Sequence, residues 1–206
     1  MKKLMILVLA LFTVTASTSQ VVKLEHVAYT IYFDTQLKQP LCTYYVLEPT
    51  ELGGDFNRTT FKADPLILST MQGQDADYYL SGFDRGHLSP NDDFRFDLTV
   101  QLESMYYTNC VPQNSTLNRG TWKSLENYVR VLAIFSPVQV WTGVTYGNST
   151  STIGKLVVPV YFWKLIKVNG NYEAYHIPNS SPLSKNFSDY KIPVEELLLT
   201  MMEWRK

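Results

Sequence analysis

Apolar and polar residues alternate near the start of the chain, where every second position from 27 to 33 is valine, tyrosine, isoleucine or phenylalanine. A second apolar run covers positions 41 to 47. Successive side chains of a strand point to opposite faces, so these runs predict two short antiparallel strands. The stretch from 49 to 74 is polar and rich in turn residues, and we expect it to form loops.

A helical period appears between positions 117 and 135. Its apolar residues recur at steps of three, four and three, which places them on one face of a helix. These residues are Trp122, Leu125, Val129 and Leu132. A second periodic segment, 193 to 204, begins with proline, which suits the first turn of a helix, and predicts a short closing helix.

Two runs rich in β-branched and aromatic residues, 138 to 144 and 157 to 168, predict further strands, and the second has the composition of a central strand. The helices do not alternate regularly with the strands. The pattern therefore favours an α+β fold with an antiparallel sheet. With 206 residues, 45% of them hydrophobic, the chain has the size of one domain with a real core.

The first 19 residues have a different character. Two lysines precede an apolar run from 4 to 12, and small and hydroxylated residues follow. This order is typical of a secretory signal peptide, so we predict a signal peptide at 1–19, one domain at 20–206, and a secreted or periplasmic protein. The apolar run is too short to span a bilayer, and no later stretch predicts a membrane span.

The charge balance bears on the kind of partner. The chain has 18 basic and 19 acidic residues, and without Lys2 and Lys3 the basic residues number 16. A protein that coats nucleic acid nonspecifically is normally basic, so this balance argues against a passive coat protein and leaves open an enzyme that concentrates positive charge in one cleft. Cys42 and Cys110 lack the spacing of a zinc site, and both a disulfide and two free thiols remain open.

One of the three histidines, His87, lies in the run SGFDRGHLSPNDDF at positions 81 to 94. Glycine, proline and asparagine predict a turn here. A polar turn and a catalytic imidazole held by charged neighbours are both compatible with this composition. His26 and His176 have no such surroundings, and we expect both to be structural.

The predicted long helix carries Glu126 and Arg130 about 40° apart, beside its apolar stripe. An ion pair on the helix surface would explain them. The preceding segment TNCVPQNSTLNRG, 108 to 120, supplies several asparagines, however. Amide oxygens with one carboxylate nearby suit Mg²⁺, which accepts few protein ligands and keeps most of its waters.

In order and spacing, four separated motifs resemble the DNA/RNA non-specific endonuclease family, which includes secreted bacterial nucleases and mitochondrial endonuclease G. The resemblance runs from about His26 to Leu199 and includes the arginine segment 57–65. The motifs are Asp84-Arg85-Gly86-His87, then Asn109 with Pro112-Gln113, then Leu117-Asn118-Arg119-Gly120 with Trp122, and Leu125-Glu126 with Arg130. The fold that it implies is the ββα-metal (His-Me finger) nuclease fold, with a central antiparallel sheet and flanking helices.

The resemblance also implies roles for single residues. His87 matches the general base, Asn118 the direct metal ligand, and Glu126 the carboxylate that binds the metal through water. Asn109 matches a residue that positions the histidine and the metal region. The arginines that match phosphate-facing positions are Arg58, Arg85 and Arg130. From its place before His87, we expect Asp84 to support the histidine.

The expected activity is Mg²⁺-dependent hydrolysis of phosphodiester bonds in DNA and RNA, with 5′-phosphate products. Mn²⁺ or another divalent cation is an alternative to Mg²⁺. A catalytically inactive nucleic-acid-binding or interaction protein on the same fold is the alternative function. The sequence gives no indication of a homodimer, which stays open.

Overall fold

The computed structural model describes residues 21–181 and 183–203. The predicted signal peptide at 1–19 lies outside these residues. Within the described ranges, none of the helices combines the length and the apolar character that crossing a membrane requires.

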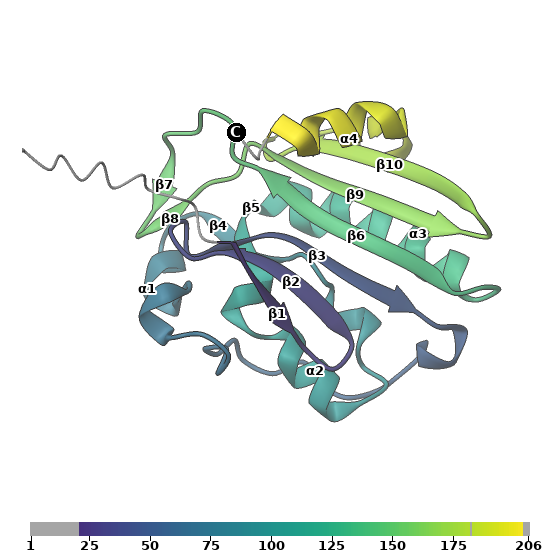
Figure 1. Cartoon of the computed structure of the whole chain (residues 1–206), viewed down its shortest axis with the longest axis horizontal. Helices are drawn as coiled ribbons and strands as arrows, with labels where there is room; N and C mark the ends of the chain where they lie inside the picture. The colour runs from purple at the N-terminus through teal and green to yellow at the C-terminus, as the bar shows by residue number, and fades with distance from the viewer. Residues whose placement is uncertain (1–20, 182, 204–206) are drawn as a thin grey trace, which may run out of the picture.

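A seven-stranded antiparallel sheet forms the centre of the molecule (Figure 1). Its strands, in spatial order, are β1 (Val21–Glu25), β2 (Tyr29–Asp34), β3 (Gln39–Leu47), β6 (Val138–Thr145), β9 (Tyr161–Val168), β10 (Asn171–Pro178) and β11 (Lys191–Ile192). This arrangement confirms the α+β class and the antiparallel sheet. The predicted early strand pair is β2 and β3, which are hydrogen-bonded neighbours.

Two predicted features of the strands need correction. The run 157–168 is not one strand, because it divides into β8 (Leu156–Val157) and β9 around Pro159, which has no amide hydrogen to donate. Strand β10 is missing from the prediction, although Asn169 and Gly170 indicate the hairpin turn that precedes it. Both residues have positive φ, 49° and 79°, as the tightest hairpin turns require.

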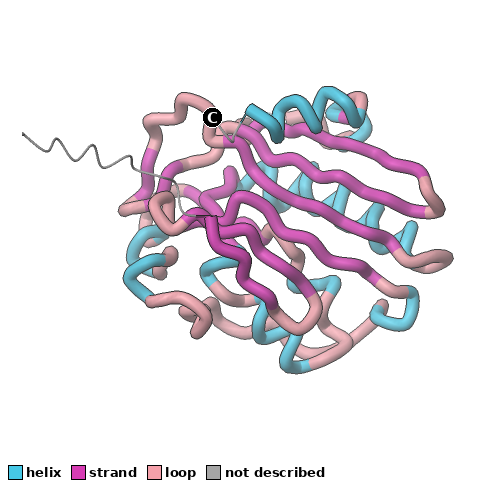
Figure 2. The backbone as a smooth tube through the Cα atoms, viewed as in Figure 1, coloured by secondary structure: helices cyan, strands magenta, loops and turns pink. Residues whose placement is uncertain are grey.

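Helices cover both faces of the sheet (Figures 1 and 2). Along β9, Phe162 and Ile166 belong to the main core together with α3 (Lys123–Ala133). Trp163 and Leu165 point to the opposite face and pack with Leu197 of α4 (Val194–Glu203). The predicted stripe of the long helix is confirmed, since its residues are buried or partly buried in the main core.

A second, two-stranded sheet lies beside the large one. It pairs β4 (Phe83–His87) with β5 (Cys110–Asn114), and a π-helix, η5 (Leu117–Trp122), leads from β5 into α3. The prediction of a turn around His87 is therefore wrong, because His87 ends a strand. Gly86 is needed for close packing rather than for turning: a Cβ there would lie 2.3 Å from Oε1 of Gln113.

The remaining short elements surround these two sheets. They are α1 (Asp75–Tyr78), α2 (Leu98–Ser104), the strand pair β7 (Thr152–Ile153) and β8, and the 3₁₀ helices η1 (Pro49–Glu51), η2 (Ser69–Met71), η3 (Asn91–Asp93), η4 (Tyr107–Asn109) and η6 (Phe187–Tyr190). Cys42 and Cys110 do not form a disulfide, which settles the alternative that the sequence left open.

Candidate active site

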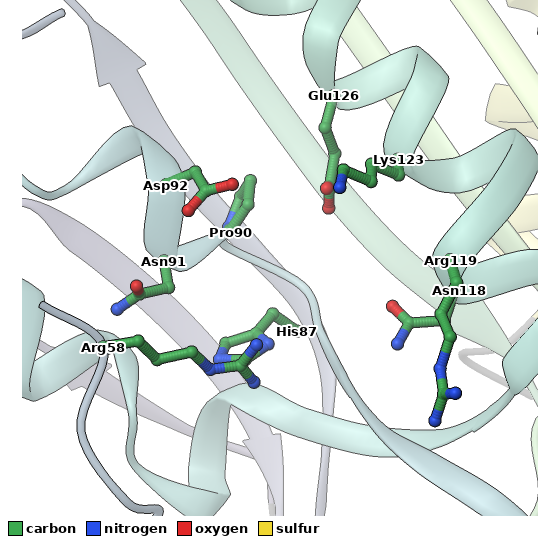
Figure 3. A pocket seen from close by; sticks show the side chains of 9 residues that line it. All are labelled: Arg58, His87, Pro90, Asn91, Asp92, Asn118, Arg119, Lys123 and Glu126. Carbon is green, nitrogen blue, oxygen red and sulfur yellow. The ribbon is translucent and has the colours of Figure 1, made fainter. Parts of the chain in front are cut away.

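A cavity of about 370 Å³ lies between β4, η3 and the helix formed by η5 and α3 (Figure 3). Four of the residues that the sequence singles out meet there, although they are spread over nearly seventy positions of the chain. These are Arg58, His87, Asn118 and Glu126. The other residues of the wall are Pro90, Asn91, Asp92, Arg119 and Lys123.

His87 stands at the end of β4, and only 9% of it is exposed. Burial, together with the nearby positive charge of Arg58, lowers the pKa of the imidazole to about 3. The ring is therefore neutral at neutral pH. Its Nε2 is buried without a hydrogen-bond partner among the described residues.

Asn118 lies in the π-helix, and its side chain points into the cavity (Figure 3). Its amide nitrogen Nδ2 donates a hydrogen bond of 2.9 Å to Oδ2 of Asp84. Nε and Nη2 of Arg119 donate to the same carboxylate at 2.8 and 2.6 Å. Burial acts to raise the pKa of Asp84, but the hydrogen bonds from Arg119 and Asn118 outweigh it and lower that pKa.

These contacts correct the expectation that Asp84 supports His87. The hydrogen bonds of its carboxylate go to Asn118 and Arg119. Because the amide nitrogen of Asn118 is engaged by Asp84, the amide oxygen is left to accept a donor or a cation from the cavity.

The π-helical turn brings Asn118 and Glu126 onto one face of their helix. Residues eight positions apart in a regular α-helix differ by about 80° around the axis. A π-turn contains one residue more than an α-turn, so the pair behaves like residues seven positions apart, about 20° from alignment. Both side chains consequently line the same cavity. Regular helical spacing does not reveal this alignment.

Glu126 is the carboxylate of the helical wall. Burial and the negative charges of Asp93 and Asp92 raise its pKa to about 7, against the opposing effect of Lys164 and Arg130. Without a bound cation, this side chain therefore exchanges its proton near neutral pH.

Lys164 on β9 is a residue of this region that the sequence reasoning missed. Its side chain is fully buried. Its Nζ donates a hydrogen bond of 2.7 Å to Oγ1 of Thr142 and lies 4.8 Å from the centre of the Trp122 ring. Burial lowers the pKa of Lys164 to about 8. The sequence did contain a signal for this residue: a lysine inside the apolar run 157–168 is unusual, because an unpaired charge is costly in a core.

Two of the three predicted arginines do not line the cavity. Nη1 of Arg130 donates a hydrogen bond of 2.6 Å to Oδ1 of Asp93, and Nη2 donates one of 2.5 Å to Oδ1 of Asn127. Nη2 of Arg85 donates a hydrogen bond of 2.5 Å to Oδ1 of Asp75. Arg58 alone of the three lies in the cavity wall.

Asn109 is fully buried and fixes the chain that follows His87. Its side chain accepts from the amide of Ser89 at 2.9 Å and donates to the carbonyl oxygens of Ser89 and Ser104 at 2.8 and 2.9 Å. Its own carbonyl accepts from the amide of Leu88 at 3.0 Å. Asn109 thus acts on the backbone next to His87 and does not line the cavity.

The other two histidines lie outside this cavity. Nε2 of His26 is 3.1 Å from Oδ2 of Asp64, and the ring of His176 stacks on Tyr161 at a centroid distance of 4.3 Å. These contacts agree with the structural roles expected for both.

Comparison with known proteins identifies similar chains. The model of the DNA/RNA non-specific endonuclease family matches residues 9–198. Mitochondrial endonuclease G of Bos taurus is 30% identical over 192 residues, covering 84% of this chain and 62% of that protein. The mitochondrial nuclease EXOG of Xenopus laevis is 28% identical over 196 residues, covering 84% of this chain and 55% of that protein.

A solved structure of the EndoG/EndoGI complex contains a chain that matches with a TM-score of 0.79 and 25% sequence identity. The match covers 85% of this chain and 81% of the other. It supports the nuclease fold expected from the sequence motifs. The chain spans about six-tenths of the length of the curated relatives described above.

The comparisons correct the predicted location. The relatives described above are named as mitochondrial nucleases, which points away from secretion and from the periplasm. The expectation of a secreted or periplasmic protein, which came from the composition of residues 1–19, is therefore wrong.

Proposed function

The chain belongs to the DNA/RNA non-specific endonuclease family, and from this premise we propose that it hydrolyses phosphodiester bonds of DNA and RNA with a divalent cation, preferably Mg²⁺. One observation carries the proposal: a neutral imidazole, an oriented amide oxygen and a carboxylate face one cavity. They belong to His87, Asn118 and Glu126.

The residues present fit a hard cation with few protein ligands. Among the described residues, no three or more histidine, cysteine, aspartate or glutamate side chains form a group that could hold a metal. Mg²⁺ does not need such a group, because it retains several waters and binds one or two protein oxygens. Asn118 Oδ1 would be the direct ligand, and Glu126 would act through water. Mn²⁺ is the alternative cation.

A cation bound there would neutralise the charge that develops on the leaving 3′ oxygen. The protein supplies the base. His87 is neutral at pH 7 and can take the proton of the attacking water. Because its Nε2 is buried, we assign Nδ1 as the nitrogen that accepts this proton. Breaking the bond to the 3′ oxygen leaves the phosphate on the 5′ end.

Positive side chains in the wall would bind the phosphate groups. Arg58, Arg119 and Lys123 line the same cavity as His87. Contacts with phosphates position the nucleic acid without reading its bases, which agrees with hydrolysis of any sequence. The roles of Arg85 and Arg130 stay predictions. Their ion pairs with Asp75 and Asp93 would have to open or shift before either guanidinium could contact a phosphate.

The test is incubation of purified protein with supercoiled plasmid and with single-stranded RNA, in the presence of Mg²⁺ or Mn²⁺ and after addition of a chelator. We expect both substrates to be cut and the chelator to stop cutting. Absence of cutting with every cation would contradict the proposal. If the same protein still retained labelled DNA in a binding assay, the catalytically inactive nucleic-acid-binding protein would be the better description.

A further inference from the structure

The ring of Phe61 lies among three residues of the proposed machinery. Its centroid is 4.9 Å from that of the His87 ring, 5.4 Å from Cζ of Arg58 and 5.7 Å from Cζ of Arg85. The ring also stacks on Tyr107, with centroids 5.9 Å apart. Phe61 itself is only partly buried, and it packs at the edge of a second, smaller hydrophobic cluster that includes Tyr107 rather than in the main core.

The backbone next to Phe61 is anchored, whereas the chain before it is not. Lys62 forms an isolated β-bridge with Tyr106. The Lys62 amide donates a hydrogen bond of 3.1 Å to the Met105 carbonyl, and the Tyr107 amide donates one of 3.0 Å to the Lys62 carbonyl. Residues 54–61 form no helix or strand. The ring of Phe61 is therefore attached to a fixed backbone, three residues after Arg58.

The Arg58 guanidinium packs on this ring. Within the described part of the chain it makes no hydrogen bond or ion pair; it contacts the face of Phe61, and the charge of Asp84 acts on it from beyond ion-pair distance. Arg85 differs, because it is also held by Asp75 and lies over the ring of Tyr78 at 5.2 Å. Loss of the aromatic face would thus release Arg58 but leave Arg85 with two other partners.

We propose that Phe61 is a positioning residue of the active site, whose ring holds the Arg58 guanidinium at the cavity and excludes water from one side of the His87 ring. A cation is attracted to the face of an aromatic ring, and this attraction grows as water is removed. A leucine would fill much of the space without offering that face. The low pKa of His87 agrees with both parts of the role, because burial and the charge of Arg58 cause it.

The inference rests on the proposed function for its substrate, and a double-mutant cycle tests it. We expect Phe61→Leu to lower kcat/KM on plasmid about tenfold, mainly through kcat, and Phe61→Tyr to lower it less than about threefold. In an Arg58→Ala background, Phe61→Leu should cost less than about twofold, because the residue it positions is gone. Equal losses in the two backgrounds would overturn the proposal.

A matched variant separates this role from general packing. Phe187 is also partly buried, and its ring contacts are Tyr128 and Tyr175, which do not line the cavity. Phe187→Leu should lower Tm but leave kcat/KM unchanged. If Phe61→Leu does not fold, Phe61→Met provides the second ring-free variant for the same cycle.

A measurement without substrate distinguishes failure of this inference from failure of the proposed function. The chain has three histidines, so the His87 resonance can be identified from a His87→Gln variant and titrated by NMR. The charged groups that line its cavity are Arg58, Asp92, Arg119, Lys123 and Glu126. We expect His87 to titrate at higher pH in Phe61→Leu than in the parent or in Phe61→Tyr. An unchanged midpoint in all three would overturn the role of Phe61, whether or not the protein cuts nucleic acid.

Discussion

Nδ2 of Asn118 donates a hydrogen bond of 2.9 Å to Oδ2 of Asp84, two residues that are 34 positions apart in the chain. The bond joins the strand that carries His87 to the helix that carries Glu126. Groups that orient a metal ligand from behind influence metal binding nearly as much as the ligand itself. Asp84 therefore belongs to the proposed metal site rather than to the histidine.

Replacement of Asp84 by alanine should weaken the binding of the divalent cation. Without the carboxylate, the Asn118 amide is free to rotate, and we expect the cation concentration for half-maximal activity to rise about tenfold or more. Activity measured over a range of Mg²⁺ concentrations, with calorimetric titration of the same variant, checks this. Arg119→Ala is the control, because it removes the hydrogen bonds of Arg119 to the same carboxylate but keeps the bond between Asp84 and Asn118. An equal effect of the two variants would contradict the role of Asp84.

The burial of His87 predicts how stability depends on pH. The folded-state pKa of about 3 lies below the ordinary value of 6.5. Between these values the unfolded chain binds a proton that the folded chain does not, so His87 lowers the free energy of unfolding as pH falls, by about 1.4 kcal/mol per pH unit. Denaturant unfolding between pH 7 and 4 should show this slope in the difference between the parent and His87→Gln, because the opposite contribution of Glu126, whose raised pKa adds stability as pH falls below 7, is common to both proteins. Parallel curves would show that His87 is not buried as described.

The same shift changes the pH dependence of activity that an unperturbed imidazole would give. An ordinary imidazole would lose its activity as a base below about pH 6. Because burial and Arg58 lower the pKa of His87 to about 3, the base should remain neutral well below pH 6. A fall in activity nearer pH 7 would instead reflect protonation of Glu126, whose pKa is raised to about 7 by burial.

The π-turn predicts an asymmetry between a deletion and an insertion. Deletion of Gly120 would place Asn118 and Glu126 seven positions apart, a spacing that a regular α-helix keeps on one face. Activity should then fall less than about tenfold. One alanine inserted after Gly120 instead turns Glu126 by about 100° around the helix axis, and activity should fall at least about 100-fold. Rates on plasmid and helical content by circular dichroism check both. Gly120→Ala is the control, because its Cβ meets no atom within 4 Å. Equal loss from deletion and insertion would refute the alignment.

The ion pair of Arg130 predicts a structural effect. The side chain of Asp93 is fully buried and that of Arg130 is 20% exposed. Arg130→Ala leaves this carboxylate without its cation, and the free energy of unfolding should fall by about 3 kcal/mol. Arg119→Ala, at a 74% exposed side chain, should change it by less than about 0.5 kcal/mol. A loss of activity in Arg130→Ala without loss of stability would instead favour the phosphate-facing role that the sequence suggests.

Several elements were predictable because each is decided by its local pattern. The buried stripe of α3 and the alternation of β2 depend on which side chains face one core, and a period of 3.6 or 2 records that directly. The joint occurrence of the motifs around His87, Asn118 and Glu126 was enough to predict that these residues share a site.

Other features depend on partners that are distant in the sequence. The run around His87 contains turn residues, yet pairing with β5 makes it a strand. Asp84 lies three residues before His87, and its hydrogen bonds cross to η5. The buried charge of Lys164 becomes intelligible only when β9 is placed beneath α3, where it faces the surroundings of Glu126. Local propensity carries no information about such contacts.

The central claim is that His87 is the base of a cation-dependent hydrolysis. Its most direct test is the single-turnover rate of plasmid nicking at saturating Mg²⁺, compared between the parent and His87→Ala purified in parallel. We predict a fall of about 10² to 10⁴-fold with the fold and cation binding retained. A His87→Ala variant that nicks plasmid at the parental rate, free of contaminating nuclease, would contradict the account.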